Sequence, residues 1–317
     1  MQFPQLAAFT GGAGLIRVIG HRGARGVMPE NTMEGFAFTL NCGVRLLEFD
    51  VVMTRDGVPV ITHNHSLTGS IVRDGTGNWL QGAEPKVSDL DWADLAAMDV
   101  GGLDGRSDYG QRFPDQAFLY GARIPRLSDL CALIAQPGYR DVHLMLEIKS
   151  DPAKLKAATA RAEVVAAVVA EVRALGLTKR TLMHSFDWDL LAECARQAPE
   201  MPTSFLTQLP ENAADVGEDH AAASLELTKA GASPPDLVAQ AGGALWCPYY
   251  LDVTAGQVAR AQRLGLRVAV WTVNEVADID RMISLGVDAI VTDYPGRVQR
   301  RLLAQGYVWS EETAIAV

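Results

Sequence analysis

The sequence predicts an α/β protein, a TIM-type (β/α)8 barrel of parallel strands. Short β-branched runs alternate with longer segments of helical period, and eight such runs are present. A chain of 317 residues with 48% hydrophobic residues can bury a large core, and one barrel explains this length better than two average domains. The runs occupy 15–19, 46–52, 144–148, 181–183, 203–206, 244–247, 267–271 and 289–291.

Helical segments separate these runs, as the return connections on the outside of a barrel require. The clearest spans 153–175, where apolar residues recur at helical spacing and Gly176 marks the end. Shorter helices are predicted after Asn31, over 128–135 and over 278–284.

One long segment breaks the alternation. From Asn64 to about Arg123 the chain is rich in Gly, Asp, Trp and Pro, and only 88–98 has a helical pattern. Long insertions are usually functional or disordered, and the aromatic residues of this one favour order. We therefore predict one domain, 1–317, with a small inserted subdomain at about 64–123. It follows the second β/α unit and lies over one mouth of the barrel.

Composition limits the expected partners and location. The formal net charge is −10 and there is no lysine-rich tract, so neither nucleic acid nor stable membrane association is expected. The four cysteines are scattered without metal-type spacing, and residues 1–16 lack the basic start of a secretory signal. A cytoplasmic protein is the expectation, and no feature indicates its oligomeric state.

Charged and polar residues gather where the predicted strands end. His21 and Arg22 follow the first run, a grouping that suits an anionic substrate. Glu48 and Asp50 lie two positions apart on the second run, so both carboxylates point to one side of the pleat. Burying two like charges is costly unless a cation joins them. The carboxyl ends of barrel strands form the catalytic face, which also receives His63, Glu147, Lys149, His184, Trp271, Asn274 and Asp293.

Structural roles remain open for several of these residues. The two carboxylates of the second run suit an ion-pair network with Arg22 and Arg25, and Glu147 suits a pair with Lys149 on the same strand face. The structural alternative for Trp271 is packing in the core, and for His184 it is a hydrogen bond at a strand end. For Asp293 it is the start of a turn.

The ordered set of motifs closely resembles the glycerophosphodiester phosphodiesterases. No single motif is decisive, but together they span almost the whole chain in the order of that family. They are His21-Arg22-Gly23, Pro29-Glu30-Asn31-Thr32, Glu48-Phe49-Asp50, Thr54-Arg55-Asp56-Gly57, His63, Glu147-Ile148-Lys149, Trp271-Thr272-Val273-Asn274 and Thr292-Asp293-Tyr294-Pro295.

The resemblance implies a phosphoric diester hydrolase of glycerol and lipid metabolism. Such an enzyme converts a small glycerophosphodiester into sn-glycerol 3-phosphate and an alcohol, with the neighbouring hydroxyl of the glycerol as first nucleophile and a cyclic phosphate that water opens. One divalent cation is implied, and carboxylate ligands favour Mg²⁺ or Ca²⁺ over zinc. The implied roles are metal ligation by Glu48, Asp50 and Glu147, acid–base catalysis by His21 and His63, and substrate binding by Arg22, Lys149 and Trp271.

One position departs from the family pattern. The residue after the second histidine is usually Asp, but here it is Asn64, followed by His65. Asn keeps the shape and the local hydrogen bonds of Asp, whereas loss of an orienting charge would change the pH optimum. His63 is preferred over His65 as the catalytic residue because His65 lies beyond the strand end, in the insertion.

Two other functions are weighed against this one. A lysophospholipase D or sphingomyelinase-D-like enzyme would use the same metal and histidines on a lipid, and an exposed apolar rim on the insertion would favour it. A non-catalytic barrel that binds polyol phosphates is the second alternative, and the presence of both His21 and His63 argues against it. The sequence indicates neither the leaving alcohol nor the choice between Mg²⁺ and Ca²⁺.

Overall fold

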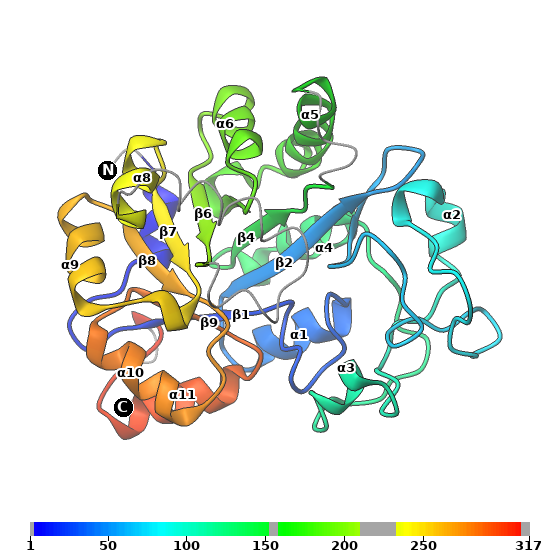
Figure 1. Ribbon diagram of the computed structural model, residues 1–317, viewed down its shortest axis with the longest axis horizontal. Helices are drawn as coiled ribbons and strands as arrows, with labels where there is room; N and C mark the ends of the chain where they lie inside the picture. Colours follow the sequence, from blue (N-terminus) through cyan, green and yellow to red (C-terminus); the bar gives the residue numbers. More distant parts are fainter. Residues whose placement is uncertain (1–2, 152–157, 210–232, 312–317) are drawn as a thin grey trace.

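The predicted barrel is confirmed in a computed structural model, which describes residues 3–151, 158–209 and 233–311 (Figure 1). Neighbouring barrel strands pair in parallel, and β1 pairs with both β9 and β2, which closes the ring. Each predicted run overlaps one of these strands. They are β1 (Arg17–Gly20), β2 (Leu46–Met53), β4 (His143–Ile148), β5 (Thr181–Ser185), β6 (Thr203–Thr207), β7 (Leu245–Pro248), β8 (Arg267–Val270) and β9 (Ala289–Thr292).

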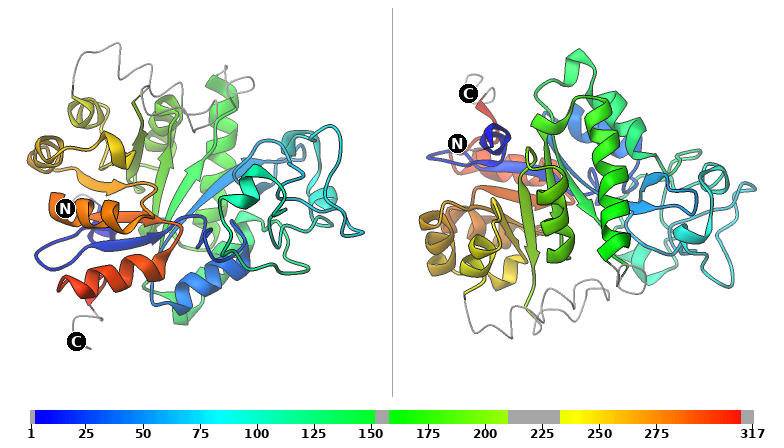
Figure 2. Two further views of the ribbon diagram at one scale, coloured as in Figure 1. Left: turned by 60° about the horizontal axis from the view of Figure 1, so that its bottom comes forward. Right: turned by 90° about the horizontal axis from the view of Figure 1, so that it is seen from above.

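Helices surround the ring of strands (Figure 2). The predicted helix over 153–175 is present as α5 from Ala158, and 152–157 lie outside the described residues. Gly176 follows α5 with a φ of 68°, a left-handed conformation that favours glycine. No helix among the described residues is long and apolar enough to cross a membrane. The helices are α1 (Met33–Asn41), α4 (Leu127–Ile134), α5 (Ala158–Ala174), α6 (Trp188–Gln197), α8 (Pro234–Gln240), α9 (Ala255–Arg263), α10 (Val276–Leu285) and α11 (Pro295–Ala304), with short 3-10 helices η1 (Pro4–Phe9), η3 (Pro137–Tyr139), η4 (Thr178–Arg180) and η6 (Tyr250–Asp252).

The strands bury residues on both faces, and one strand illustrates how this creates a site. In β2, Leu47 and Phe49 point outward into the core beneath the helices, where Phe49 packs edge-on against Phe36 at 5.8 Å. Leu46 points inward and joins the core inside the barrel. This core also includes Phe9 of η1. By the two-residue alternation of a strand, the next inward positions of β2 are Glu48 and Asp50. The inward column therefore changes from apolar to acidic toward the carboxyl end.

The inserted segment follows β2 and lies to one side of the barrel (Figure 1). It begins after β3 (Pro59–Ile61), which pairs antiparallel with β2. The chain comes back to β3 at Pro125, whose carbonyl oxygen accepts a hydrogen bond from Ile61 N at 2.8 Å. The segment has a small core of its own, which includes Leu67, Val87 and Leu95. Its helices are η2 (Val87–Asp89), α2 (Trp92–Leu95) and α3 (Asp108–Gln111).

The helix predicted over 88–98 is divided in the structure. Leu90 is extended, and Asp91 begins a new helix, α2, with a capping box to Asp94. The sequence pattern was therefore correct about a helical tendency but too long, because an N-cap residue lies in its middle.

Candidate functional site

A cavity of about 510 Å³ opens at the carboxyl ends of the barrel strands. Asp50 lies beside it, buried, with its carboxylate within hydrogen-bond distance of Asn31 Nδ2 at 2.9 Å. The structure therefore brings all the sequence-predicted site residues into one region. Those that line the cavity are His21, Arg22, Glu48, His63, Glu147, Lys149 and Trp271.

Three buried carboxylates form a cluster in this region. Oxygen atoms of Glu48, Asp50 and Glu147 all lie within 4.8 Å of one another. Burial and the two neighbouring carboxylates raise the pKa of Glu48 well above its usual range. Burial, with a contribution from Asp50, raises the pKa of Glu147 to about 7. Such mutual repulsion fits a site for a hard divalent cation, whose charge would offset that of the carboxylates.

The third carboxylate of the cluster is in a different electrostatic setting. Burial alone would raise the pKa of Asp50, but nearby cations, among them Arg22 and Lys149, hold it well below its usual range. Asp50 Oδ2 lies 3.3 Å from Arg22 Nε, and Asp50 Oδ1 lies 3.8 Å from Lys149 Nζ. Asp50 is therefore the carboxylate of the cluster that stays ionised most readily.

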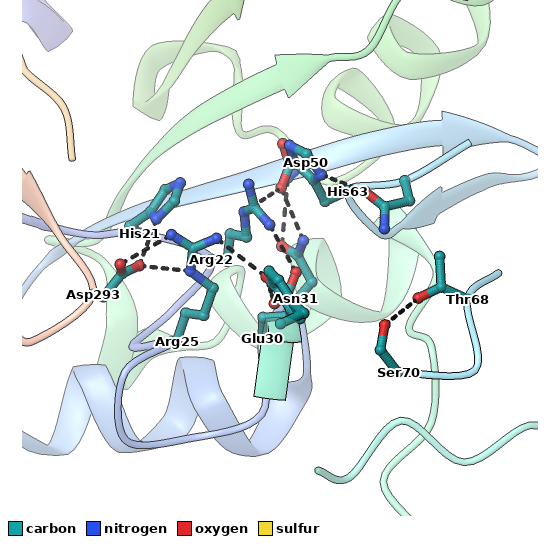
Figure 3. Close-up of polar contacts among 12 residues, drawn as sticks. His21, Arg22, Arg25, Glu30, Asn31, Asp50, His63, Thr68, Ser70 and Asp293 are labelled. Atoms are coloured by element: carbon teal, nitrogen blue, oxygen red, sulfur yellow. Dashed lines mark hydrogen bonds and ion pairs between the residues drawn. The ribbon is translucent and has the colours of Figure 1, made fainter. Parts of the chain in front are cut away.

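His21 is held by a buried carboxylate on the last strand end. Its Nδ1 lies 2.6 Å from Asp293 Oδ1 (Figure 3). This contact directs Nε2 toward Glu48 Oε2 at 3.8 Å. Arg25 donates to both oxygens of Asp293, at 2.9 and 3.0 Å, and Asn274 Nδ2 donates to Oδ2 at 2.7 Å. Burial lowers the pKa of His21, and Asp293 opposes that shift.

His63 has a different set of partners. Its Nδ1 lies 2.7 Å from Asn64 Oδ1, and its Nε2 lies 3.3 Å from Lys149 Nζ. Because an ammonium only donates, Nε2 is the acceptor, and Nδ1 carries the proton that Asn64 accepts. Burial, Arg22 and Lys149 hold the pKa of His63 well below its usual range. Its neighbour His65 contacts Ser150 O at 3.3 Å and is not among the residues that line the cavity.

Arg22 and Lys149 also contact carboxylates. Arg22 has a φ of 49°, and its backbone N–H donates to Glu48 Oε2 at 2.9 Å. Its Nη1 donates to Glu30 Oε1 at 2.8 Å, so the guanidinium lies between Glu30 and Asp50 (Figure 3). Lys149 donates to Glu147 Oε1 at 3.0 Å. Of the ion pairs considered from the sequence, those of Arg22 and Lys149 are present in the cavity wall, whereas Arg25 pairs with Asp293 instead of the β2 carboxylates.

Aromatic residues form the opposite part of the wall. Trp271 follows β8 and packs against Phe186 at 5.4 Å and against Tyr249 at 5.2 Å, the residues that follow β5 and β7. Its indole Nε1 donates to Cys247 O at 2.9 Å, which fixes the ring. The cavity therefore has a charged side from β1, β2 and β4 and an aromatic side from β5, β7 and β8.

The sequence matches one protein family over most of its length. The model of the Glycerophosphoryl diester phosphodiesterase family matches residues 21–297. The chain belongs to this family. It is accordingly a phosphodiesterase enzyme, as the motifs of the sequence predicted.

Individual relatives agree with the family match. A crystal structure of a protein from Silicibacter pomeroyi DSS-3, assigned as a glycerophosphoryl diester phosphodiesterase, is 57% identical, with a TM-score of 0.91 and coverage of 97% of this chain and 100% of that one. The glycerophosphodiester phosphodiesterase of Caldanaerobacter subterraneus subsp. tengcongensis is 26% identical over 88% of this chain and 94% of its own. A phosphodiesterase of Oleispira antarctica, solved with its product sn-glycerol-3-phosphate, shares the fold at 22% identity, with a TM-score of 0.67 and coverage of 91% and 97%.

Several supporting residues of this family member were not identified from the sequence. Asn31 has a φ of 55° and directs its amide to Asp50, and Glu30 pairs with Arg22. Their motif was recognised, but no periodic pattern indicated what these side chains contact. Tyr109 lines the cavity from the insertion, and no signal in the sequence indicated it.

The buried His184 is expected to make the protein less stable in acid. Burial lowers its pKa to about 3, and its Nδ1 lies 2.8 Å from Ser204 Oγ. Below ~6.5, the ordinary pKa of histidine, the unfolded chain binds a proton that the folded chain does not, so stability falls as the pH falls. Between pH ~7 and ~4.5 this costs ~2–3 kcal/mol. Urea unfolding at both pH values measures the free energy of unfolding of the wild type and of His184→Gln. Between these pH values His184→Gln should lose less of it than the wild type, by this amount, and equal losses would contradict the lowered pKa of His184.

Proposed function

We propose that the protein is a metal-dependent glycerophosphodiester phosphodiesterase that releases sn-glycerol 3-phosphate and an alcohol by acid–base catalysis of two histidines. The observation that carries this proposal is that two histidines with different partners, an arginine and a lysine of the cavity wall lie beside three clustered carboxylates. Family membership supports it, and so does the Oleispira relative, whose bound product is the product proposed here.

Glu48, Asp50 and Glu147 would hold the cation. Their oxygens are the hard ligands that Mg²⁺ and Ca²⁺ prefer, and their closeness within 4.8 Å is costly without a positive charge between them. A bound cation polarises a phosphoryl oxygen and stabilises the negative charge that develops there.

Arg22 and Lys149 bind the phosphate in this proposal, and Trp271 contacts the glycerol. Both cations lie in the cavity wall beside the carboxylate cluster, and a guanidinium offers paired donors to phosphate oxygens. The aromatic side of the cavity offers an apolar surface for the carbon atoms of the glycerol. The substrate would thus lie with its phosphate toward the charged side.

The two histidines take opposite roles. His63 accepts the proton of the attacking hydroxyl, which is the neighbouring hydroxyl of the glycerol, because burial, Arg22 and Lys149 disfavour its charged form. His21 donates a proton to the leaving alkoxide as the phosphorus–oxygen bond breaks, because the Asp293 carboxylate stabilises its charged form. Water then opens the cyclic phosphate to sn-glycerol 3-phosphate, with the two proton transfers reversed. Different environments for two titratable groups are the usual basis of such a division of roles.

We further propose that 1–317 is a single domain and that the substrate is a small glycerophosphodiester rather than a lipid. A lipid substrate would favour an exposed apolar rim on the insertion. The exposed aromatic residues of the insertion, Phe118 and Tyr120, instead lie against Arg73 and are not among the residues that line the cavity.

Removal of divalent cations is expected to abolish the release of glycerol 3-phosphate from glycerophosphocholine. The physical reason is that the carboxylate cluster would then repel the phosphate. Activity is measured with the purified protein in EDTA and after addition of Mg²⁺ or Ca²⁺. Restoration by either cation supports the proposal, whereas full activity in EDTA would contradict metal dependence. No activity with any cation on several glycerophosphodiesters, in folded protein, would contradict the proposed substrate class.

A further inference from the structure

Tyr109 is the residue through which the insertion reaches the charged side of the cavity. It belongs to α3, which begins at a Ser107 cap that accepts a hydrogen bond from Gly110 N at 3.0 Å. Its ring packs edge-on against Phe113 at 5.4 Å. A helix of one turn is not stable by itself, so these contacts and the barrel determine where the tyrosine lies.

The hydroxyl of Tyr109 bridges two groups of the barrel. It donates a hydrogen bond to Glu30 Oε2 and accepts one from Arg25 Nη1 at 3.2 Å. The other oxygen of Glu30 accepts from Arg22 Nη1 at 2.8 Å. The insertion is thereby connected to Arg22 through a single carboxylate, which is itself buried. Burial and Glu30 raise the pKa of Tyr109 to about 12, so the hydroxyl keeps its proton at neutral pH.

We propose that Tyr109 is a positioning residue that fixes the guanidinium of Arg22 through Glu30, so that the insertion sets the affinity of the site for the phosphate group. This inference rests on the proposed role of Arg22 in phosphate binding. Arg22 lies between two carboxylates, with Asp50 at 3.3 Å from its Nε. If Glu30 lost its second donor, it would be free to turn, and the direction of Arg22 would no longer be fixed.

Tyr109→Phe is expected to raise KM by ~10-fold with little change in kcat, because hydrogen bonds to charged groups are among the stronger ones and the histidines are untouched. The inhibition constant of inorganic phosphate should rise by the same factor. KM should rise equally for glycerophosphocholine and glycerophosphoethanolamine, because Arg22 contacts the phosphate that both share. The matched control is Tyr120→Phe, which removes the hydroxyl of an insertion tyrosine that is 84% exposed.

Other results would overturn the inference. A tyrosine that contacts the leaving alcohol would change KM for one substrate more than for the other and leave phosphate inhibition unaltered. Unchanged KM and unchanged phosphate inhibition would show that Tyr109 does not act on Arg22. A lower kcat at constant KM would also contradict a role in phosphate affinity.

A double-mutant cycle with Glu30→Gln tests the route. Glu30→Gln removes the charge of the group between Tyr109 and Arg22 and should raise KM similarly. This variant tests the same connection if Tyr109→Phe does not fold. In the Glu30→Gln background, Tyr109→Phe should have little further effect, and additive effects would exclude action through Glu30. If the wild type hydrolyses no diester, the proposed function fails. Calorimetric phosphate binding by wild type and Tyr109→Phe would then still decide the role of Tyr109.

Discussion

Replacing His63 with alanine is expected to lower turnover of a glycerophosphodiester by ~10²–10⁴-fold, the usual contribution of one acid–base group. The reason is that His63 lines the cavity with an acceptor nitrogen kept unprotonated by burial, Arg22 and Lys149. His65→Ala is the matched control, because His65 contacts Ser150 outside the cavity lining. Release of glycerol 3-phosphate at saturating cation measures both. A large loss in His65→Ala, with normal turnover in His63→Ala, would reverse the assignment.

The leaving group distinguishes the base from the acid. An activated alcohol such as p-nitrophenol departs without protonation, so it should largely restore the chemical step in His21→Ala and not in His63→Ala. Both variants are compared on glycerophosphocholine and on a p-nitrophenyl diester of glycerol phosphate. Restoration in His63→Ala alone would exchange the two roles, and restoration in neither would contradict the assignment of an acid.

The carboxylate cluster was predictable from the sequence because its residues obey local rules. Alternation along β2 places Glu48 and Asp50 on one face, and the parallel register places Asp50 beside Glu147 on β4. Strand periodicity and strand order therefore determine most of this cluster. The same rules placed His21 at a strand end, next to the acidic strand in the ring.

The partners of these residues were less predictable. Asp293 meets His21 because β9 lies beside β1 when the barrel closes, a contact between residues 272 positions apart. Closure could be predicted, but the direction of each side chain depends on packing that periodicity does not describe. Tyr109 shows the limit more clearly, because the insertion is mostly irregular and its position follows from tertiary contacts. Local motifs thus predicted the charged side chains that line the cavity better than the residues that orient them.

The second large effect is expected from Glu48→Gln, which should lower activity by at least ~10²-fold, as removal of a group needed to bind a catalytic metal does. Its effect on stability should be different. Asp50 and Glu147 repel the Glu48 carboxylate, and the amide oxygen of glutamine can still accept the hydrogen bond from Arg22 N. Without a divalent cation, the variant should therefore unfold at a temperature no lower than that of the wild type.

Thermal unfolding with and without cation separates a metal ligand from a structural ion pair. Mg²⁺ or Ca²⁺ should raise the unfolding temperature of the wild type, because a ligand that binds only the folded state stabilises it. This increase should be lost or much reduced in Glu48→Gln. Asp99→Asn is the control, since it removes a buried carboxylate that pairs with Arg73 in the insertion, and it should lower stability but keep the cation-dependent increase. If Glu48→Gln instead lost stability without cation and kept the increase, Glu48 would serve the ion-pair network and the metal would be bound elsewhere.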